Sequence, residues 1–353
     1  MRAPLALLAA LAAAASMHVQ AAEQLIGGRV ESLLEFARER HPEFAALRAE
    51  AESAAARIEP AGALPDPRLR TELRDVTNEG RDASANLLPP RIGSARYSFS
   101  QTLPWAGKLD LRRDVAGAGA DEARARARAG WVDLATRIKA TYAQHHVHLL
   151  SIRHAKESLD LMRRVAEIAR TRYASGLGGQ QDALRAQTEI VAMETDLTML
   201  EGESAQASAR MRALLGRPEN VKLRPPDLLR TLPPQPSLEL KILEERLRAN
   251  NPQLAAVDAR IAGAEKNKAL VELNRYPDVT LGVSPTQVRN RVAQWELMFE
   301  INIPLQQESR RAQEREAELN LEAARLRRAD ALNQVLASLA ESLAGLEVAR
   351  KLE

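Results

Sequence analysis

A helical segment of unusual length is the feature that most restricts how this chain can fold. Residues 109–173 contain no proline, and at 1.5 Å per residue such a helix would extend roughly 100 Å. No globular domain needs that length. The chain has 353 residues, of which only 3% are aromatic, and alanine, leucine, arginine and glutamate dominate its composition. This composition is typical of long helical rods and disfavours a large α/β core.

Two apolar stripes predict that the long helix turns back on itself. The second stripe has strict three- and four-residue spacing, which favours coiled-coil packing. The glycine-rich residues 175–179 lie between the stripes and predict the tip of a helical hairpin. A third rod is expected after Pro304. The first stripe consists of Trp131, Leu134, Ile138, Tyr142, His145, Leu149 and Ile152, and the second of Ile190, Met193, Leu197, Leu200, Ser204, Ala207, Met211 and Leu214.

One order of elements occurs twice along the chain. A helix that begins at Pro42 is followed by two alternating stretches that end before Pro104, and then by a long helix. The same order begins again at Pro252 and reaches Pro304. An internal duplication is the simplest account. We therefore expect a first repeat at 22–215 (β-hairpin at about 66–104, helical hairpin at about 109–215), a proline-rich linker at 216–240, and an incomplete second repeat at 241–353 (β-hairpin at about 277–304, then a long helix).

The first 21 residues are typical of an export signal. Arg2 gives a positive start, and residues 5–15 form an apolar run of about eleven residues, too short to span a bilayer. Ala21 is the best cleavage position. No other segment reaches the roughly 18 apolar residues of a membrane-spanning helix. A membrane role would therefore require β-structure.

The four alternating stretches each have one apolar and one polar face, which predicts two β-hairpins. Two interpretations fit: an ordinary half-buried sheet covered by helices, or membrane strands. Six of the eleven aromatic residues lie in or beside these hairpins, as an aromatic girdle requires, and the stretches approach the length of a transmembrane strand. In the membrane interpretation, the lipid-facing residues are Tyr97, Phe99, Trp295, Leu297 and Phe299, and the lumen-facing residues are Glu296 and Glu300.

Four strands cannot enclose a lumen, and an open sheet edge in lipid would leave backbone groups unpaired. A barrel must therefore be shared, and three chains would give twelve strands. With threefold symmetry, Glu296 and Glu300 would form carboxylate rings that favour cations.

Several other classes of function are excluded or disfavoured. The chain has no cysteine, which rules out disulfides and thiolate metal sites, and a formal charge of +3 gives no cationic field for nucleic acid. No nucleophile elbow, phosphate loop or paired-carboxylate site is present, so we expect no catalytic residues and no cofactor. His145 and His148 have a spacing that could share a metal ion, but a single helix offers too few ligands. We predict no metal site.

Four segments of the sequence resemble the TolC-like outer-membrane efflux proteins, in the expected order over nearly all of the mature chain. Two of them, around Pro65 and Pro104, look most like the heavy-metal (cobalt-zinc-cadmium or copper) branch of that family. The segments are Ala63-Leu64-Pro65-Asp66-Pro67, Gln101-Thr102-Leu103-Pro104-Trp105-Ala106-Gly107-Lys108, Arg172-Tyr173-Ala174-Ser175-Gly176 and Tyr276-Pro277-Asp278.

The resemblance implies a mainly α-helical fold with a small β part. Long antiparallel coiled-coil helices would form a periplasmic α-barrel, and two β-hairpins per chain would contribute to a twelve-stranded barrel in the outer membrane of a homotrimer. It implies a passive duct without catalysis, which works with a periplasmic adaptor and an inner-membrane pump and exports substrates such as heavy-metal cations. The adaptor would dock at the tip formed by Arg172, Tyr173, Gly176, Leu177 and Asp182.

The sequence departs from the family pattern at one point. It stops at Glu353, before the second helical tip that the family has, so we expect either a fragment or a truncated gene. The competing interpretation is a periplasmic coiled-coil structural or adaptor protein without a membrane barrel. That interpretation explains the rods and the export signal, but it does not explain the duplicated aromatic hairpins.

Overall fold

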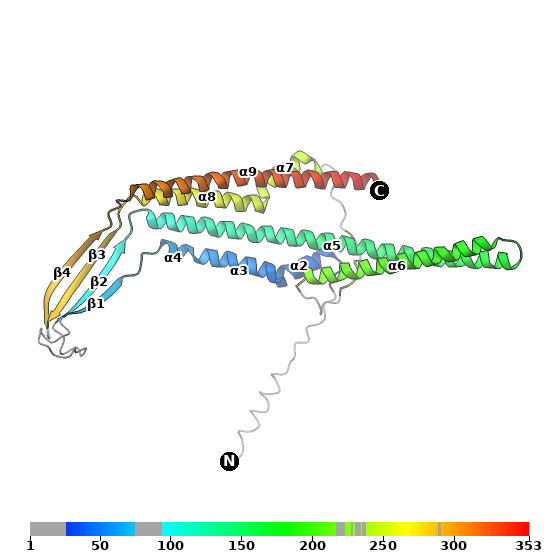
Figure 1. Ribbon diagram of the computed structural model, residues 1–353, viewed down its shortest axis with the longest axis horizontal. Coiled ribbons are helices and arrows are strands. Elements are labelled where there is room, and N and C mark those ends of the chain that lie inside the picture. Colours follow the sequence, from blue (N-terminus) through cyan, green and yellow to red (C-terminus); the bar gives the residue numbers. More distant parts are fainter. Residues whose placement is uncertain are drawn as a thin grey trace, which may run out of the picture. The chain divides into compact units, whose positions relative to one another are not determined.

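The computed structural model describes residues 26–74, 94–216, 223–226, 229, 234, 238–288 and 291–352. The predicted export signal, both hairpin turns and much of the linker lie outside these residues. The described residues form helices and one four-stranded antiparallel sheet (Figure 1), which confirms the predicted mainly helical fold with a small β part. Among the described helices, none combines the length and the apolar character that crossing a membrane requires.

The elements follow the same order in each half of the chain. The first half contains α2 (Val30–Arg40), α3 (Pro42–Ala56), α4 (Ile58–Gly62), β1 (Arg68–Arg74), β2 (Ser94–Leu103), α5 (Lys108–Ala174) and α6 (Gln180–Leu214). The second half contains α7 (Leu240–Asn250), α8 (Pro252–Leu273), β3 (Val279–Val288), β4 (Arg291–Ile301) and α9 (Gln307–Leu352). By contact density the chain divides into two compact units, residues 1–45 with 131–232 and residues 46–130 with 233–353, and α5 runs through both.

Helices α2 and α7 were not expected from the sequence, and they extend the similarity between the two halves. Each has 11 residues and is followed by one extended residue, His41 (φ −72°, ψ 121°) or Asn251 (φ −72°, ψ 120°). A proline comes next in both cases and begins the following helix. The residue before a proline avoids helical backbone angles, whereas proline itself suits the first helical position. An extended residue followed by proline therefore separates two helices at the corresponding place in each half.

The sheet has the order β1-β2-β3-β4, so the two hairpins join along β2 and β3. Leu69 lies opposite Phe99, Phe99 opposite Val283, and Val283 opposite Leu297. Paired residues share a face of a sheet, so most odd-numbered residues lie on one face and most even-numbered residues on the other. An irregularity between Thr286 and Gln287 shifts the register of β4 by one residue, which places Val292 on the odd face and Arg291 on the even face.

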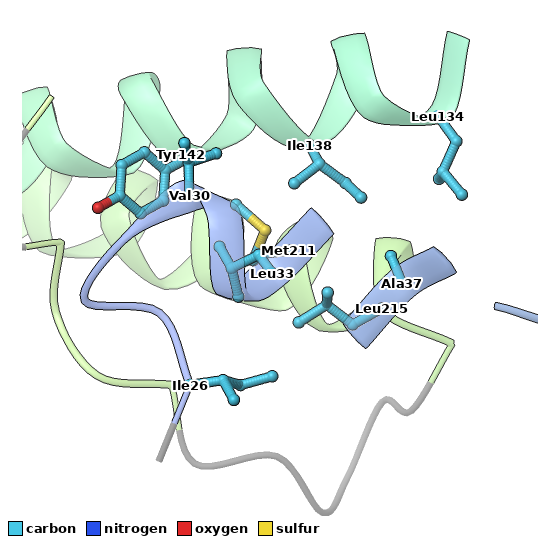
Figure 2. Packing of buried hydrophobic residues seen from close by; sticks show 9 residues of the cluster. All are labelled: Ile26, Val30, Leu33, Ala37, Leu134, Ile138, Tyr142, Met211 and Leu215. Carbon is cyan, nitrogen blue, oxygen red and sulfur yellow. The ribbon is translucent and has the colours of Figure 1, made fainter. Parts of the chain in front are cut away.

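The core of the first unit lies where α2 packs against α5 and α6 (Figure 2). Its largest fully buried side chains are Leu33 from α2, Ile138 from α5, Met211 from α6 and Leu215. The Tyr142 hydroxyl donates a 2.7 Å hydrogen bond to the carbonyl oxygen of Gly28. Part of the predicted coiled-coil stripe is therefore covered by α2.

In the second unit, α8 packs along α9, with Leu254, Ala317, Leu321 and Ala324 buried. Ion pairs such as Arg325–Glu265, at 2.9 Å, join the two helices, but their side chains are about half exposed. Exposed ion pairs contribute at most about 1 kcal/mol. Burial of the apolar residues is therefore the main source of stability here.

Candidate functional site: the two-faced sheet and the helical tip

The odd face of the sheet is apolar and exposed. Leu297 is 89% exposed, Trp295 70% and Phe299 68%, although such side chains are normally buried. All five residues predicted to face lipid lie on this face and are exposed in the chain described here; their contact with lipid stays a prediction. The exposed apolar residues of this face are Leu69, Leu73, Tyr97, Phe99, Leu103, Leu281, Val292, Trp295, Leu297, Phe299 and Ile301. A contiguous apolar surface of this extent marks a membrane or protein contact.

The even face is largely polar, with Met298 and Val288 as exposed apolar exceptions, and side-chain contacts connect its strands. The hydroxyls of Ser98 and Ser284 lie 2.9 Å apart, and those of Thr102 and Thr280 lie 3.0 Å apart. Arg96 on β2 forms an ion pair with Glu296 on β4. Glu296 and Glu300, the predicted lumen residues, both belong to this face.

A buried ion pair joins the two halves of the chain where the sheet meets the helices. The Lys108 ammonium, at the start of α5, donates hydrogen bonds to Asp278 Oδ1 at 2.7 Å and to the Tyr276 carbonyl oxygen at 3.0 Å. The backbone N–H of Trp105 donates to the same carboxylate oxygen at 2.9 Å. The Trp105 and Tyr276 rings stack with their centroids 5.0 Å apart. The sequence indicated the two segments that meet here, one around Trp105 and one around Tyr276, but it did not indicate their contact.

The electrostatics of this junction favour the charged pair. Burial alone would raise the pKa of the Asp278 carboxyl. The hydrogen bonds from Lys108 and from the Trp105 backbone, together with the positive charges of Lys108 and Arg112, outweigh this effect and leave the pKa below its usual value. Asp278 is therefore ionised at neutral pH and compensates the charge of the buried ammonium.

The helical tip has the geometry of a Schellman motif. The Leu177 N–H donates to the Arg172 carbonyl oxygen at 2.8 Å, and the Gly176 N–H donates to the Tyr173 carbonyl oxygen at 3.0 Å. Gly176 has a φ of +70°, which glycine adopts without strain. No atom of the described residues lies within 4 Å of where its Cβ would be. Tyr173 and Leu177 are exposed, and Asp182 lies in the first turn of α6. The structure thus brings the predicted docking residues to one end of the helical hairpin.

The histidines of α5 have separate surroundings. His148 Nδ1 lies 3.3 Å from Glu203 Oε2 and His146 Nδ1 lies 3.3 Å from the Pro226 carbonyl oxygen. His145 Nδ1 is buried and has no hydrogen-bond partner among the described residues. Burial, followed by the nearby charges of His148 and His146, lowers the pKa of His145. In the described part of the chain, no three metal-binding side chains converge.

Comparison with known proteins decides the family. A model of the family described as "Outer membrane efflux protein" matches residues 33–217, more than half of the chain. The chain belongs to the outer membrane efflux protein family. This confirms the predicted TolC-like family and its outer-membrane location. The family consists of efflux channels and not of enzymes, which confirms the prediction that the chain is not an enzyme. The heavy-metal branch stays a prediction.

Individual relatives agree with this assignment. The chain is 26% identical over 271 residues to the pyoverdine export outer membrane protein OpmQ of Pseudomonas putida, covering 72% of this chain and 55% of that protein. It therefore spans about half the length of the curated relatives it matches. The outer-membrane channel OprN has the same fold, with a TM-score of 0.73, 20% identity, and 91% of this chain and 74% of that one covered. So does VceC of Vibrio cholerae, with a TM-score of 0.74, 20% identity, and coverage of 90% and 79%.

Proposed function

We propose that the chain is a subunit of a passive outer-membrane duct in a tripartite efflux system. The observation that supports this most directly is the division of the sheet: large apolar side chains are exposed on one face, and every charged residue of the described strands lies on the other. A strand that separates lipid from a water-filled lumen requires this alternation. The competing periplasmic scaffold would leave the apolar face in water.

The duct is a homotrimer in this proposal. The sheet of one chain has two outer strands, β1 and β4, with no further strand beside them among the described residues. Open edges in lipid leave backbone groups without hydrogen bonds, at a cost of several kcal/mol per group. Pairing β4 of one copy with β1 of the next removes these edges, and three copies give a twelve-stranded barrel.

The adaptor docks at the tip, and an inner-membrane pump delivers the substrate. Tyr173 and Leu177 are exposed apolar side chains beside a turn whose glycine has open space around it, as close approach by a partner requires. Different observations favour two different substrate classes. The sequence segments around Pro65 and Pro104 favour heavy-metal cations, whereas the names of the curated relatives favour pyoverdine.

The membrane assignment is tested with a charge on each face of β4. Phe299→Arg puts a cation on the apolar face and is expected to cost about 2–4 kcal/mol if it faces the bilayer centre. The matched control, Gln294→Arg, puts the same charge on the polar face of the same strand. We expect the first variant to lose trimer in the outer-membrane fraction and the second to retain it. Equal yields, or release of wild-type protein by osmotic shock, would favour the periplasmic scaffold.

The tip is tested with two glycines that both have open space. Gly176→Val should abolish cross-linking to the adaptor and efflux while the trimer stays stable in detergent. Gly202 lies within α6, and no other part of the described chain lies within 4 Å of its Cβ position. Gly202→Val should preserve cross-linking. Loss of the trimer in Gly176→Val would show that this glycine is structural, and normal efflux would place docking elsewhere.

A further inference from the structure

The charges on the polar face of the sheet are not balanced. This face contains five arginines and three glutamates, a net charge of +2 per chain over the described strands, and the opposite face has no charged residue. The arginines are Arg68, Arg70, Arg74, Arg96 and Arg291, and the glutamates are Glu72, Glu296 and Glu300.

Most of the negative charge is already compensated within the chain. Glu296 is paired with Arg96. Glu72 lies between two cations, with Arg70 Nε at 3.0 Å and an Arg74 guanidinium nitrogen at 3.5 Å. A carboxylate that is paired with a guanidinium attracts a passing cation weakly, because the two fields largely cancel beyond the pair. Of the three glutamates, only Glu300 has no ion-pair partner in the described part of the chain.

The positive charge, in contrast, is exposed. Arg68 and Arg291 have no acidic partner among the described residues, and the Arg70 side chain is 77% exposed even though it contacts Glu72. Arginine stays protonated at every accessible pH. In pores, rings of arginine or lysine favour anions, and rings of aspartate or glutamate favour cations.

We propose that the lumen formed by these strands favours anionic solutes, and that the arginines of β1, Arg68 and Arg70, determine this preference. The inference rests on the proposed function, because it requires the polar face to line the duct. It runs against the expectation that Glu296 and Glu300 make the lumen favour cations, because Arg96 compensates Glu296 and the arginines outnumber the glutamates. Of the substrate classes considered above, it disfavours free metal cations and favours carboxylate- or phosphate-bearing molecules.

Cysteine labelling tests the inference in the assembled protein, because the natural chain contains no cysteine. Ser100→Cys places a thiol on the polar face opposite Arg68, and Thr71→Cys places one on the apolar face of β1. Outer-membrane vesicles are treated with two methanethiosulfonate reagents of similar size, one anionic and one cationic. Each rate is divided by the rate of the same reagent with a small free thiol.

The two positions separate the proposed function from the inference. If the polar face lines the lumen, Ser100→Cys reacts and Thr71→Cys does not; equal reaction at both positions refutes the proposed function and the inference with it. At Ser100→Cys, the corrected anionic rate should exceed the cationic rate. A corrected ratio of one or below, with Thr71→Cys protected, refutes the inference alone.

The role of the β1 arginines is measured as a change in this ratio. Glutamine at both positions removes two positive charges from the face on which the thiol lies, and these charges act in opposite directions on the anionic and the cationic reagent. Arg68→Gln combined with Arg70→Gln should therefore lower the anionic-to-cationic ratio at Ser100→Cys roughly threefold or more at low salt. The control, Arg96→Gln with Glu296→Gln, removes one charge of each sign and should leave the ratio unchanged. An unchanged ratio in the Arg68 and Arg70 variant would refute their role, as would a larger change in the control.

Discussion

The ion pair between Lys108 and Asp278 should stabilise the junction far more than an ion pair on a helix surface. The Lys108 side chain is only 4% exposed, and that of Asp278 is 31% exposed. Removing one partner of a fully buried pair costs about 3–5 kcal/mol, because the other charge is left uncompensated. The partial exposure of Asp278 reduces this cost. Asparagine also retains a side-chain oxygen that accepts the hydrogen bond from the Trp105 backbone N–H. We therefore expect Asp278→Asn to cost about 2 kcal/mol.

Hydrogen exchange of the full chain in detergent measures this cost locally. The backbone N–H of Trp105 donates to Asp278 and is therefore the reporter. At about 1.4 kcal/mol per tenfold change, a loss of 2 kcal/mol accelerates its exchange roughly 30-fold. The control is Asp114→Asn, because Asp114 pairs with Lys266 at a similar distance, 2.8 Å, but with both side chains about half exposed. We expect the control to accelerate exchange of its neighbouring amides about threefold or less.

The same reporter tests the electrostatic cause. Because the pKa of folded Asp278 is lowered, its stabilisation is complete above the ordinary carboxyl pKa of about 3.9 and is lost as the pH falls through the lower pKa of the folded state. Protection of Trp105, corrected for intrinsic exchange, should fall at acid pH in the wild type and stay level in Asp278→Asn. Equal acceleration by Asp278→Asn and Asp114→Asn at neutral pH would refute the argument from burial.

Three further predictions concern the first unit and the tip. Met211→Ala, at a side chain that is 2% exposed, should cost about 2–5 kcal/mol in thermal unfolding, whereas Leu177→Ala at the exposed tip should leave the transition unchanged; equal shifts would contradict the assigned core. Gly176→Ala and Gly216→Ala each place alanine at a φ of +70°, and each should lower the free energy of unfolding by about 1 kcal/mol. The Gly216 variant should lose more stability, because its Cβ would lie 2.7 Å from Pro42 Cδ, and the reverse order would rule out this contact. Burial lowers the pKa of folded His145, so the stability associated with neutral His145 is complete above its ordinary pKa of about 6.5 and is lost as the pH falls. The melting temperature should therefore drop more between pH 7.5 and 5.5 in wild type than in His145→Gln.

The sequence predicted the fold class because its strongest signals are local. The helix expected at 109–173 spans Lys108–Ala174 in the structure, and the tip coincides with Gly176. Helix α2 lies before the repeated order, which begins at Pro42, and its 11 residues are few beside the long rods, although its buried residues Val30, Leu33 and Ala37 have three- and four-residue spacing. A second signal was available: His41-Pro42 and Asn251-Pro252 both end a preceding helix, which would have revealed α2 and α7 together.

The candidate sites were predictable only in part. Alternation alone assigns Phe299 and Glu296 to opposite faces, because the period of a strand is two. It does not reveal that Arg96 pairs with Glu296, since these residues are 200 positions apart and their contact depends on the pairing of β2 with β3. The contact of Lys108 with Asp278 was missed for the same reason. Long-range register decides which charges are compensated, and periodicity contains no information about it.

The central seam of the sheet also determines when the sheet can form. Thr102 on β2 and Thr280 on β3 contact each other although 178 positions separate them in the sequence. The first hairpin can form early, but the inner edge of β2 has no partner until the ribosome and the export machinery have delivered the second half of the chain. Closing so long a loop is entropically costly and slows folding. During that interval an apolar strand with a free edge is open to wrong pairing, so assembly depends on keeping the first hairpin apart from other chains until the second arrives.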